Sequence, residues 1–255
     1  MAYTSTKYSA VPQGKVYIAS RNASGQTSGF THVGDCDVSK ITTSQSFLDI
    51  QESMSGNRAN VAHILTNTDV GVELVLKSID GPNLARAFYG DSVAQAAGTV
   101  TGEAITAYAG TMSALKYPGV SAVVVKKGAT TLVAGTDYEL DAENGTLTFL
   151  AGSTNVTGTS GVALTVDYSH GGYAAKVKAL TSGQKEYVIR VESKSKYDDK
   201  VQITTLHRVA LNTAASIDLI NSGLNTLTVS GKLLAAPEIT ATDIDFSQYF
   251  TTVQK

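Results

Sequence analysis

The sequence predicts a mainly β fold with one short α-helix and a small β subdomain inserted into the chain. Ser and Thr make up roughly a fifth of the 255 residues, and Val is the leading β-branched aliphatic residue, a mix that half-solvated strands favour. Several segments alternate apolar and polar residues with the period of two that a β-strand requires. Gly- and Asn-containing turns separate short β-prone runs in the middle of the chain.

Alternation is clearest in the segment Val70–Lys77, where Val and Leu at every second position would form one buried face. A similar strand is predicted over Lys185–Glu192. The segment Val201–Leu211 is strand-like as well, although its alternation is looser. We place the main domain at residues 1–117 and 173–255.

A turn-rich stretch, residues 118–172, is predicted to be the inserted subdomain. Short strands are expected there at residues 122–126, 138–140, 146–150 and 162–168. Asn144-Gly145 between two β-prone runs predicts a hairpin with a type I′ turn, because that turn needs positive φ at both central residues.

One helix is predicted over Asp80–Gly90. Asp80 or Gly81 can cap it, Pro82 suits its first turn, and the terminal Gly suits its end. A second, weaker helical turn is expected at Thr213–Ile220.

Charge and hydropathy exclude two classes of partner. The 20 Lys and Arg residues are balanced by 22 Asp and Glu residues, so the chain lacks the basic surface that neutralises DNA phosphates. Specific DNA binding is therefore not expected. The longest apolar runs cover only a few residues, such as 122–125, far short of the roughly 20 that cross a bilayer, so no membrane span is expected.

The residues that catalysis or metal binding would need do not gather in a recognisable pattern. His32, His63, His170 and His207 lie in separate stretches, and Cys36 follows His32 without further ligands at metal spacing. Neither a Gly-x-Ser-x-Gly elbow nor a phosphate-binding Gly-rich loop is present. The sequence therefore predicts no enzyme, no metal site and no cofactor.

The segment Ser46–Arg58 is expected to be a loop between two strands, yet it carries Phe47, Leu48, Ile50 and Met54. An exposed loop with this much apolar surface usually has a partner that covers it. The alternative is a loop folded onto its own core.

The remaining signal is the order of features along the chain. They are an early strand region ending in Val-Gly-Asp-Cys-Asp-Val (33–38), a polar strand and the loop with residues 52–58, strand-like segments 61–67 and 70–79, the helix with residues 83–90, and the C-terminal pattern of 209–211, 217–220 and 227–233. In this order and pattern the chain resembles the major tail tube proteins of long-tailed bacteriophages. The resemblance covers most of the chain outside residues 118–172 and includes no catalytic motif.

This resemblance implies a β-sandwich or half-barrel flanked by a helix, six copies of which close into a ring with a continuous inner β-barrel. Rings would stack into a tube that conducts the phage genome without binding the DNA specifically. The implied partners are further copies of the chain and the tape-measure, tail-tip and tail-terminator proteins. The implied location is the virion tail, assembled in the host cytoplasm, with residues 118–172 on the outer surface.

Within this interpretation the loop after Ser46 becomes an inter-subunit or inter-ring contact. Its apolar side chains would be buried on a neighbour, while its charged side chains would set the register. The predicted interface residues are Phe47, Leu48, Asp49, Ile50, Glu52, Met54 and Arg58. The long strands would close the ring, and the Ser/Thr-rich strand Ser39–Ser46 suits a wetted lumen.

The alternative function is a monomeric β-sandwich binding module for a carbohydrate or a cell surface. The turn-rich insert would be its recognition face. The absence of Trp leaves few aromatic platforms for stacking on sugars, which makes this alternative the weaker one.

Overall fold

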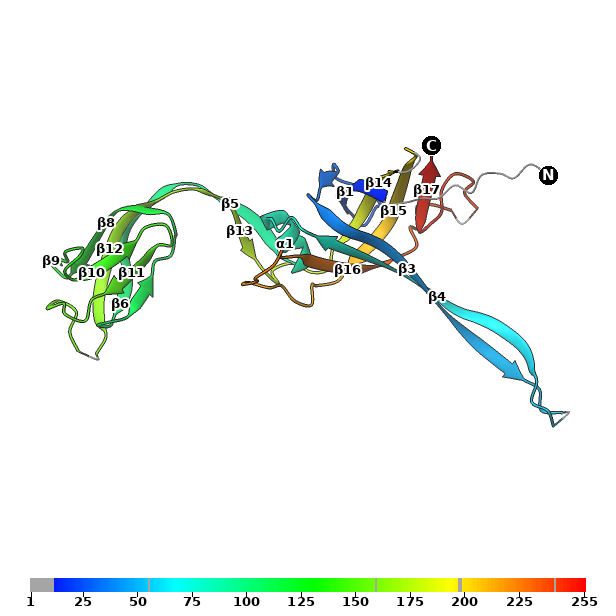
Figure 1. The fold of residues 1–255 in the computed structure, drawn as a ribbon, viewed down its shortest axis with the longest axis horizontal. Helices are drawn as coiled ribbons and strands as arrows, with labels where there is room; N and C mark the ends of the chain where they lie inside the picture. Colours follow the sequence, from blue (N-terminus) through cyan, green and yellow to red (C-terminus); the bar gives the residue numbers. More distant parts are fainter. Residues whose placement is uncertain (1–11, 55, 159, 197–198, 241) are drawn as a thin grey trace. The chain divides into compact units, whose positions relative to one another are not determined.

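The computed structural model describes residues 12–54, 56–158, 160–196, 199–240 and 242–255 (Figure 1). Residues 1–11 of the predicted main domain lie outside this part of the chain. The chain is mainly β and divides into two compact units, the first formed by Met1–Ser92 with Val177–Lys255 and the second by Val93–Lys176. Each unit has a hydrophobic core of its own.

The first unit is built on an antiparallel sheet in the order β2-β1-β14-β15-β16-β4-β3. The strand β17 also belongs to this sheet and pairs with β15. The strands are β1 (Pro12–Arg21), β2 (Thr31–His32), β3 (Cys36–Gln51), β4 (Asn60–Leu76), β14 (Glu186–Ser195), β15 (Val201–Leu211), β16 (Leu227–Leu233) and β17 (Phe250–Gln254).

Alternation along β4 produces the buried face that the sequence predicted. Val70, Val72, Leu74 and Leu76 are buried and belong to the core of the first unit, together with residues of β1, β14, β15 and β16. The predicted segments 61–67 and 70–79 form a single strand, β4, which ends at Leu76, so the prediction is wrong for residues 77–79; the partners of β4 are β3 and β16. The predicted strand Val201–Leu211 is confirmed as β15.

The predicted helix is confirmed as α1 (Gly81–Ala87). The Asp80 side chain caps it by accepting a hydrogen bond from the Asn83 backbone N–H at 2.8 Å, and Pro82 lies in the first turn, where its missing N–H costs nothing. Among the described residues, no helix has the length and apolar character needed to cross a membrane.

The helical turn expected at Thr213–Ile220 is wrong. This segment is irregular, and the Ala214 N–H donates to the Ala87 carbonyl of α1 at 2.7 Å. Ala214 and Ile217 pack against the core of the first unit. This hydrogen bond to α1 and the core contacts of Ala214 and Ile217 hold the segment in an irregular path.

The second unit contains two small sheets that share one core. A three-stranded sheet has the order β10-β11-β7 and a four-stranded sheet the order β6-β12-β8-β9. The strands are β6 (Gly98–Ala107), β7 (Met112–Ala114), β8 (Val120–Lys127), β9 (Thr130–Thr131), β10 (Tyr138–Asp141), β11 (Thr146–Phe149) and β12 (Val162–His170). The chain enters and leaves through a two-stranded sheet of β5 (Asp91–Gln95) and β13 (Tyr173–Lys178).

The second unit is longer than the insert that the sequence predicted. The prediction placed residues 118–172 in the insert, whereas the compact unit begins at Val93 and ends at Lys176. The additional strands belong there because β6 pairs with β12 and β7 pairs with β11. The Thr, Gly and Ala residues that make up much of β6 contain no sequence signal for the unit that this strand joins.

The predicted hairpin at Asn144-Gly145 is confirmed, but its turn type is wrong. Asp141 pairs with Thr146, so the loop has four residues, and of Asn144 and Gly145 only Gly145 has positive φ, at 67°. The Asp141 side chain accepts a hydrogen bond from the Asn144 backbone N–H at 3.1 Å. A four-residue loop replaces the type I′ turn because this carboxylate can hold the backbone.

Candidate subunit interface

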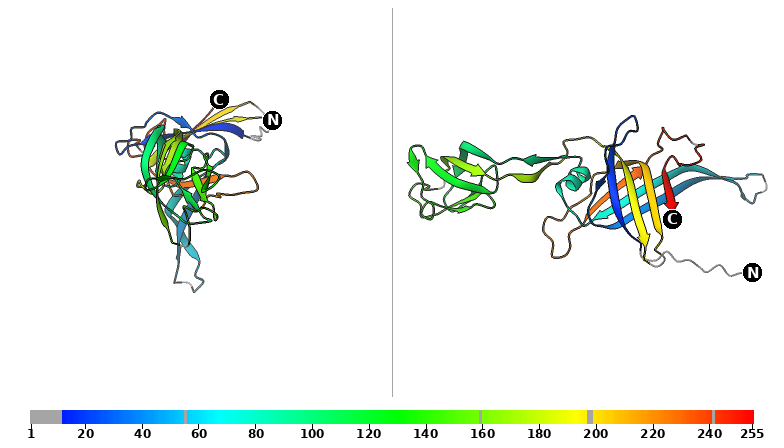
Figure 2. Two further views of the ribbon diagram at one scale, coloured as in Figure 1. Left: turned by 90° about the vertical axis from the view of Figure 1, so that its left-hand side faces the viewer. Right: turned by 90° about the horizontal axis from the view of Figure 1, so that it is seen from above.

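A long two-stranded extension leaves the sheet of the first unit. β3 and β4 pair with each other from Cys36 to Gln51, but β16 supports β4 only from Val70 to Leu76. We call the unsupported part, residues 44–54 and 56–69, the ribbon. Figures 1 and 2 show it projecting beyond the sheet to which it belongs. An isolated two-stranded hairpin is marginally stable at best in water, so the ribbon would gain from a further partner.

The structure places the seven predicted interface residues on this ribbon. Phe47, Leu48, Asp49 and Ile50 lie on β3, whereas Glu52, Met54 and Arg58 lie between the two strands. The predicted loop is therefore wrong for its first half, because β3 continues to Gln51. Pairing with β4 makes these residues a strand. The sequence did not indicate it, because neighbouring apolar residues in this segment leave no regular alternation of apolar and polar positions.

Apolar side chains occupy both faces of the ribbon. Phe47 pairs with Leu65 on one face, and Leu48 pairs with Ile64 on the other. These four side chains are 45–53% exposed, and Met54 in the turn is 95% exposed. The core of the first unit covers neither face, so the ribbon carries an exposed apolar surface of the kind that marks an interaction site.

Sequence reasoning missed the β4 side of this surface. Val61, Ile64 and Leu65 are 66%, 47% and 48% exposed. Ile64 and Leu65 are consecutive, and consecutive residues of a strand point to opposite faces. A strand with apolar residues at both positions therefore needs a partner on each face, and this was the signal in the sequence. The segment was predicted as a strand, but its residues were not assigned to the interface.

A polar pair lies within the apolar surface. The Asp49 carboxylate contacts the His63 Nδ1 atom at 2.5 Å, and the Phe47 ring stacks on the His63 ring with centroids 4.2 Å apart. At the tip, the Glu52 N–H donates to the Ala59 carbonyl at 2.9 Å. The ring stacking and the carboxylate contact hold the Phe47, Asp49 and His63 side chains together on one face of the ribbon.

The outer edge of β3 is open among the described residues, because the sheet order ends at this strand. Between Val38 and Ser46 its pairing with β4 has no register shift. Register shifts flank this stretch of β3, whereas the edge strand β6 of the second unit has its bulge within its paired length, near Gly102, whose φ is 70°. A bulge protects a sheet edge from pairing with other chains, whereas the regular stretch of β3 leaves its N–H and C=O groups available.

The sheet face opposite the first unit's core is polar at this edge. Alternation places Lys40, Thr42 and Ser44 of β3 on it, while Ser39, Ile41 and Thr43 fall on the core side. Lys40 lies opposite Glu73, and the Lys232 ammonium binds the Asp69 carboxylate at 3.1 Å. Only half of the residues of the predicted lumen strand therefore contribute to this face. The two Lys side chains on the face are balanced by the Glu73 and Asp69 side chains.

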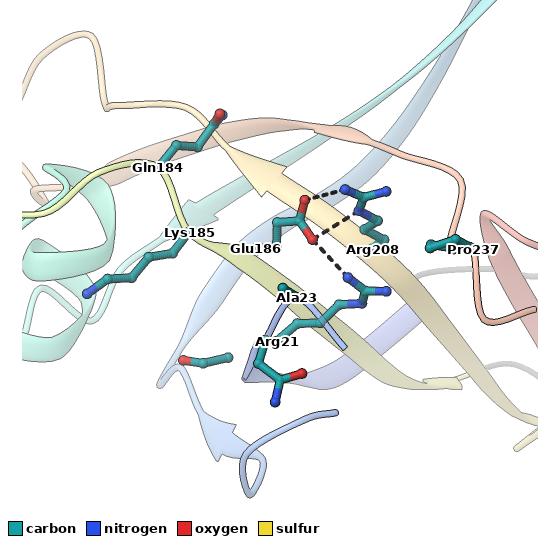
Figure 3. Close-up of a pocket in the computed structure, with 9 residues that line it drawn as sticks. Arg21, Ala23, Gln184, Lys185, Glu186, Arg208 and Pro237 are labelled. Carbon is teal, nitrogen blue, oxygen red and sulfur yellow. Dashed lines mark hydrogen bonds and ion pairs between the residues drawn. The ribbon is translucent and has the colours of Figure 1, made fainter. Parts of the chain in front are cut away.

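A separate charged cluster lines a cavity of about 460 Å³ in the first unit (Figure 3). Arg208 binds both Glu186 oxygens, at 2.6 and 2.9 Å, and Arg21 binds Glu186 at 2.8 Å. Arg21 also binds Glu238 at 2.5 Å. The cluster therefore joins β1, β14 and β15 to the C-terminal segment.

The partners of these carboxylates shift their pKa values. The hydrogen bond from Arg208 is the main reason that the pKa of Glu186 lies below its usual value, although partial burial opposes it. Burial raises the pKa of Glu238, but the hydrogen bond from Arg21 and the nearby cations together lower it by more, so that it lies below its usual value. Because the acidic and basic groups pair with one another, we assign the cluster a structural role, although the buried Arg21 Nε atom has no hydrogen-bond partner among the described residues.

Within the described part of the chain, no three His, Cys, Asp or Glu side chains gather in a way that could hold a metal ion.

Comparison with known proteins gives one finding. A family model described as "Protein of unknown function UCP028589" matches residues 9–253. No curated protein matches the sequence.

Proposed function

The chain belongs to this family of proteins of unknown function, and we propose that it is the structural subunit of the tail tube of a long-tailed bacteriophage. In this proposal six copies form a ring, and stacked rings form the conduit for the genome. The observation that carries the proposal is the ribbon, with apolar side chains on both faces and an open strand edge beside it. The order of features along the sequence supports the same function.

The ring would close through the strand edges. The eight-stranded sheet of the first unit would supply the half-barrel, and the regular stretch of β3 would pair with a strand of the neighbouring copy. Such pairing satisfies the open N–H and C=O groups and removes an edge that would otherwise promote aggregation. The ribbon, including Phe47 to Arg58, would contact a further copy.

The polar face with Lys40, Glu73, Asp69 and Lys232 suits the lumen. The charges on this face are nearly balanced, and Ser and Thr side chains lie between them, so the face stays hydrated. It has no excess of Lys or Arg side chains that would bind DNA phosphates. DNA would then pass without specific binding. The second unit would lie outside the tube, and the tape-measure, tail-tip and tail-terminator proteins would be further partners in the virion.

The stoichiometry tests this proposal. We expect light scattering from the concentrated, purified protein to give masses that are multiples of six times the 26.6-kDa chain. Each added ring would contribute one more such step. Stable dimers or tetramers would contradict the six-fold ring, because a two-fold contact buries the same surface on both copies and closes the assembly early.

A further inference from the structure

The first unit carries a groove with a volume of about 440 Å³. Residues of β1 and β3, which lie near opposite ends of the sheet order, line the groove together with core-facing residues of β14 and β15. Val16, Ile41, Val191 and Leu206 give it an apolar floor. Asp37 is the one charged residue among its described lining residues, and its side chain is 52% exposed.

The tip of the ribbon has the complementary chemistry. Ile50 is 44% exposed and Met54 is 95% exposed, and Met adapts to irregular apolar spaces because its side chain is unbranched and flexible. Arg58 is exposed at the same tip, and no ion pair joins it to another described residue. The tip thus presents apolar groups and a cation, whereas the groove offers an apolar floor and an anion.

One chain cannot bring these two surfaces together. Ile41 lines the groove and Ile50 lies near the tip, nine positions apart on the same strand, which is about 30 Å along a β-strand. β3 pairs with β4 throughout this distance, so the ribbon cannot fold back on the groove without breaking that pairing. A contact between tip and groove must therefore join two copies.

We propose that the tip of the ribbon of one copy, with Ile50 and Met54, docks in the groove of the next copy, with Arg58 facing Asp37. The inference rests on the proposed polymeric function and names the receiving surface. Donor and acceptor are different surfaces at opposite ends of β3, so the contact is head-to-tail and repeats from copy to copy. Asp37 already binds Lys77 at 2.7 Å, and Arg58 would be its second cation.

Disulfide cross-linking tests the docking directly, because the chain's single cysteine, Cys36, lines the groove. We expect M54C, oxidised at assembling concentration, to form a ladder of covalent multimers on a denaturing gel. Each copy would then bond to one neighbour through the thiol introduced at position 54 and to another through Cys36. M54C/C36S, with one thiol per chain, should give dimers at most, and so should the wild type.

The matched control is M112C, another exposed Met, at 58% exposure, that lies outside the ribbon. It should give no ladder. Introducing R58E into M54C should reduce the ladder strongly, whereas R58K should preserve it. An unchanged ladder with R58E would contradict the pairing with Asp37.

The outcomes separate this inference from the proposed function. Rings or tubes of M54C that yield no ladder would overturn the docking but leave the tail tube proposal intact. Failure of the wild-type chain to polymerise even with a tail-tip complex as nucleus would overturn both. A ladder from M54C that is absent from M112C and M54C/C36S would support the docking.

Discussion

We expect the double substitution F47D/L48D to abolish assembly into rings and tubes while the monomer stays folded. The two substitutions place a carboxylate on each face of the ribbon, where a neighbouring copy would bury it. Burying a carboxylate without a partner costs several kcal/mol, and about 1.4 kcal/mol changes an association constant tenfold. The contact would thus lose several orders of magnitude in affinity at each copy.

The monomer should tolerate the change because both side chains are about half exposed and neither belongs to the core of the first unit. Sedimentation and electron microscopy would measure assembly, and circular dichroism would measure folding. The matched control is M112D/V133D, which adds the same charges at two positions of 58% exposure in the second unit. Assembly of F47D/L48D at the wild-type level would remove the ribbon from the interface.

The second large effect concerns the charged cluster of the first unit. We expect E186A to lower the free energy of unfolding by about 3 kcal/mol, because it removes the carboxylate shared by Arg21, which is buried, and Arg208, which is partly buried. The Arg21 side chain is 2% exposed and would keep only Glu238, while Arg208 would lose both of its carboxylate contacts. Chemical denaturation in the F47D/L48D background would measure this without a contribution from assembly.

E192A is the matched control, because Glu192 on the same strand binds Arg190 in a pair whose side chains are each 37% exposed. Such exposed pairs contribute about 1 kcal/mol or less. Equal losses for E186A and E192A would contradict the structural role of the cluster.

The cluster also predicts a dependence of stability on pH. The pKa of Glu186 is lowered in the folded chain, mainly by its hydrogen bond from Arg208, so its stabilising contribution is fully present above the ordinary value of 4.5. The contribution is lost as the pH falls below 4.5 through the folded-state pKa. The difference in unfolding free energy between wild type and E186A should therefore shrink in acid, whereas a constant difference would contradict this assignment.

Local signals in the sequence predicted the elements that local interactions decide. Asp80 and Pro82 define the start of α1 through a cap and a fixed φ, and both act within one turn. The strand Val201–Leu211 was predicted with its observed ends, because its apolar content and flanking turns agree with its place in the sheet. The Asn144-Gly145 hairpin was predicted for the same local reason.

The predictions were wrong where contacts between residues far apart in the sequence determine the local structure. The segment Thr213–Ile220 has helical spacing, but the hydrogen bond from Ala214 to α1 and the core contact of Ile217 hold it in an irregular path. The start of the second unit depends on which strand β6 pairs with, and its own residues do not specify β12.

The candidate interface was half predicted. Phe47 to Arg58 were selected because apolar residues in a supposed loop need cover, and the structure exposes their apolar members. That β3 extends to Gln51, and that Val61, Ile64 and Leu65 share the surface, required knowledge of the pairing between two strands. The groove combines four strands and had no signal in any one segment.

Negative-stain imaging of the concentrated, purified protein tests the central claim most directly. We expect six-fold rings with a central hole, and tubes of stacked rings at higher concentration or with a tail-tip complex as nucleus. A particle that stays monomeric under all these conditions, with such a nucleus present, would contradict the tail tube function and favour a monomeric binding module.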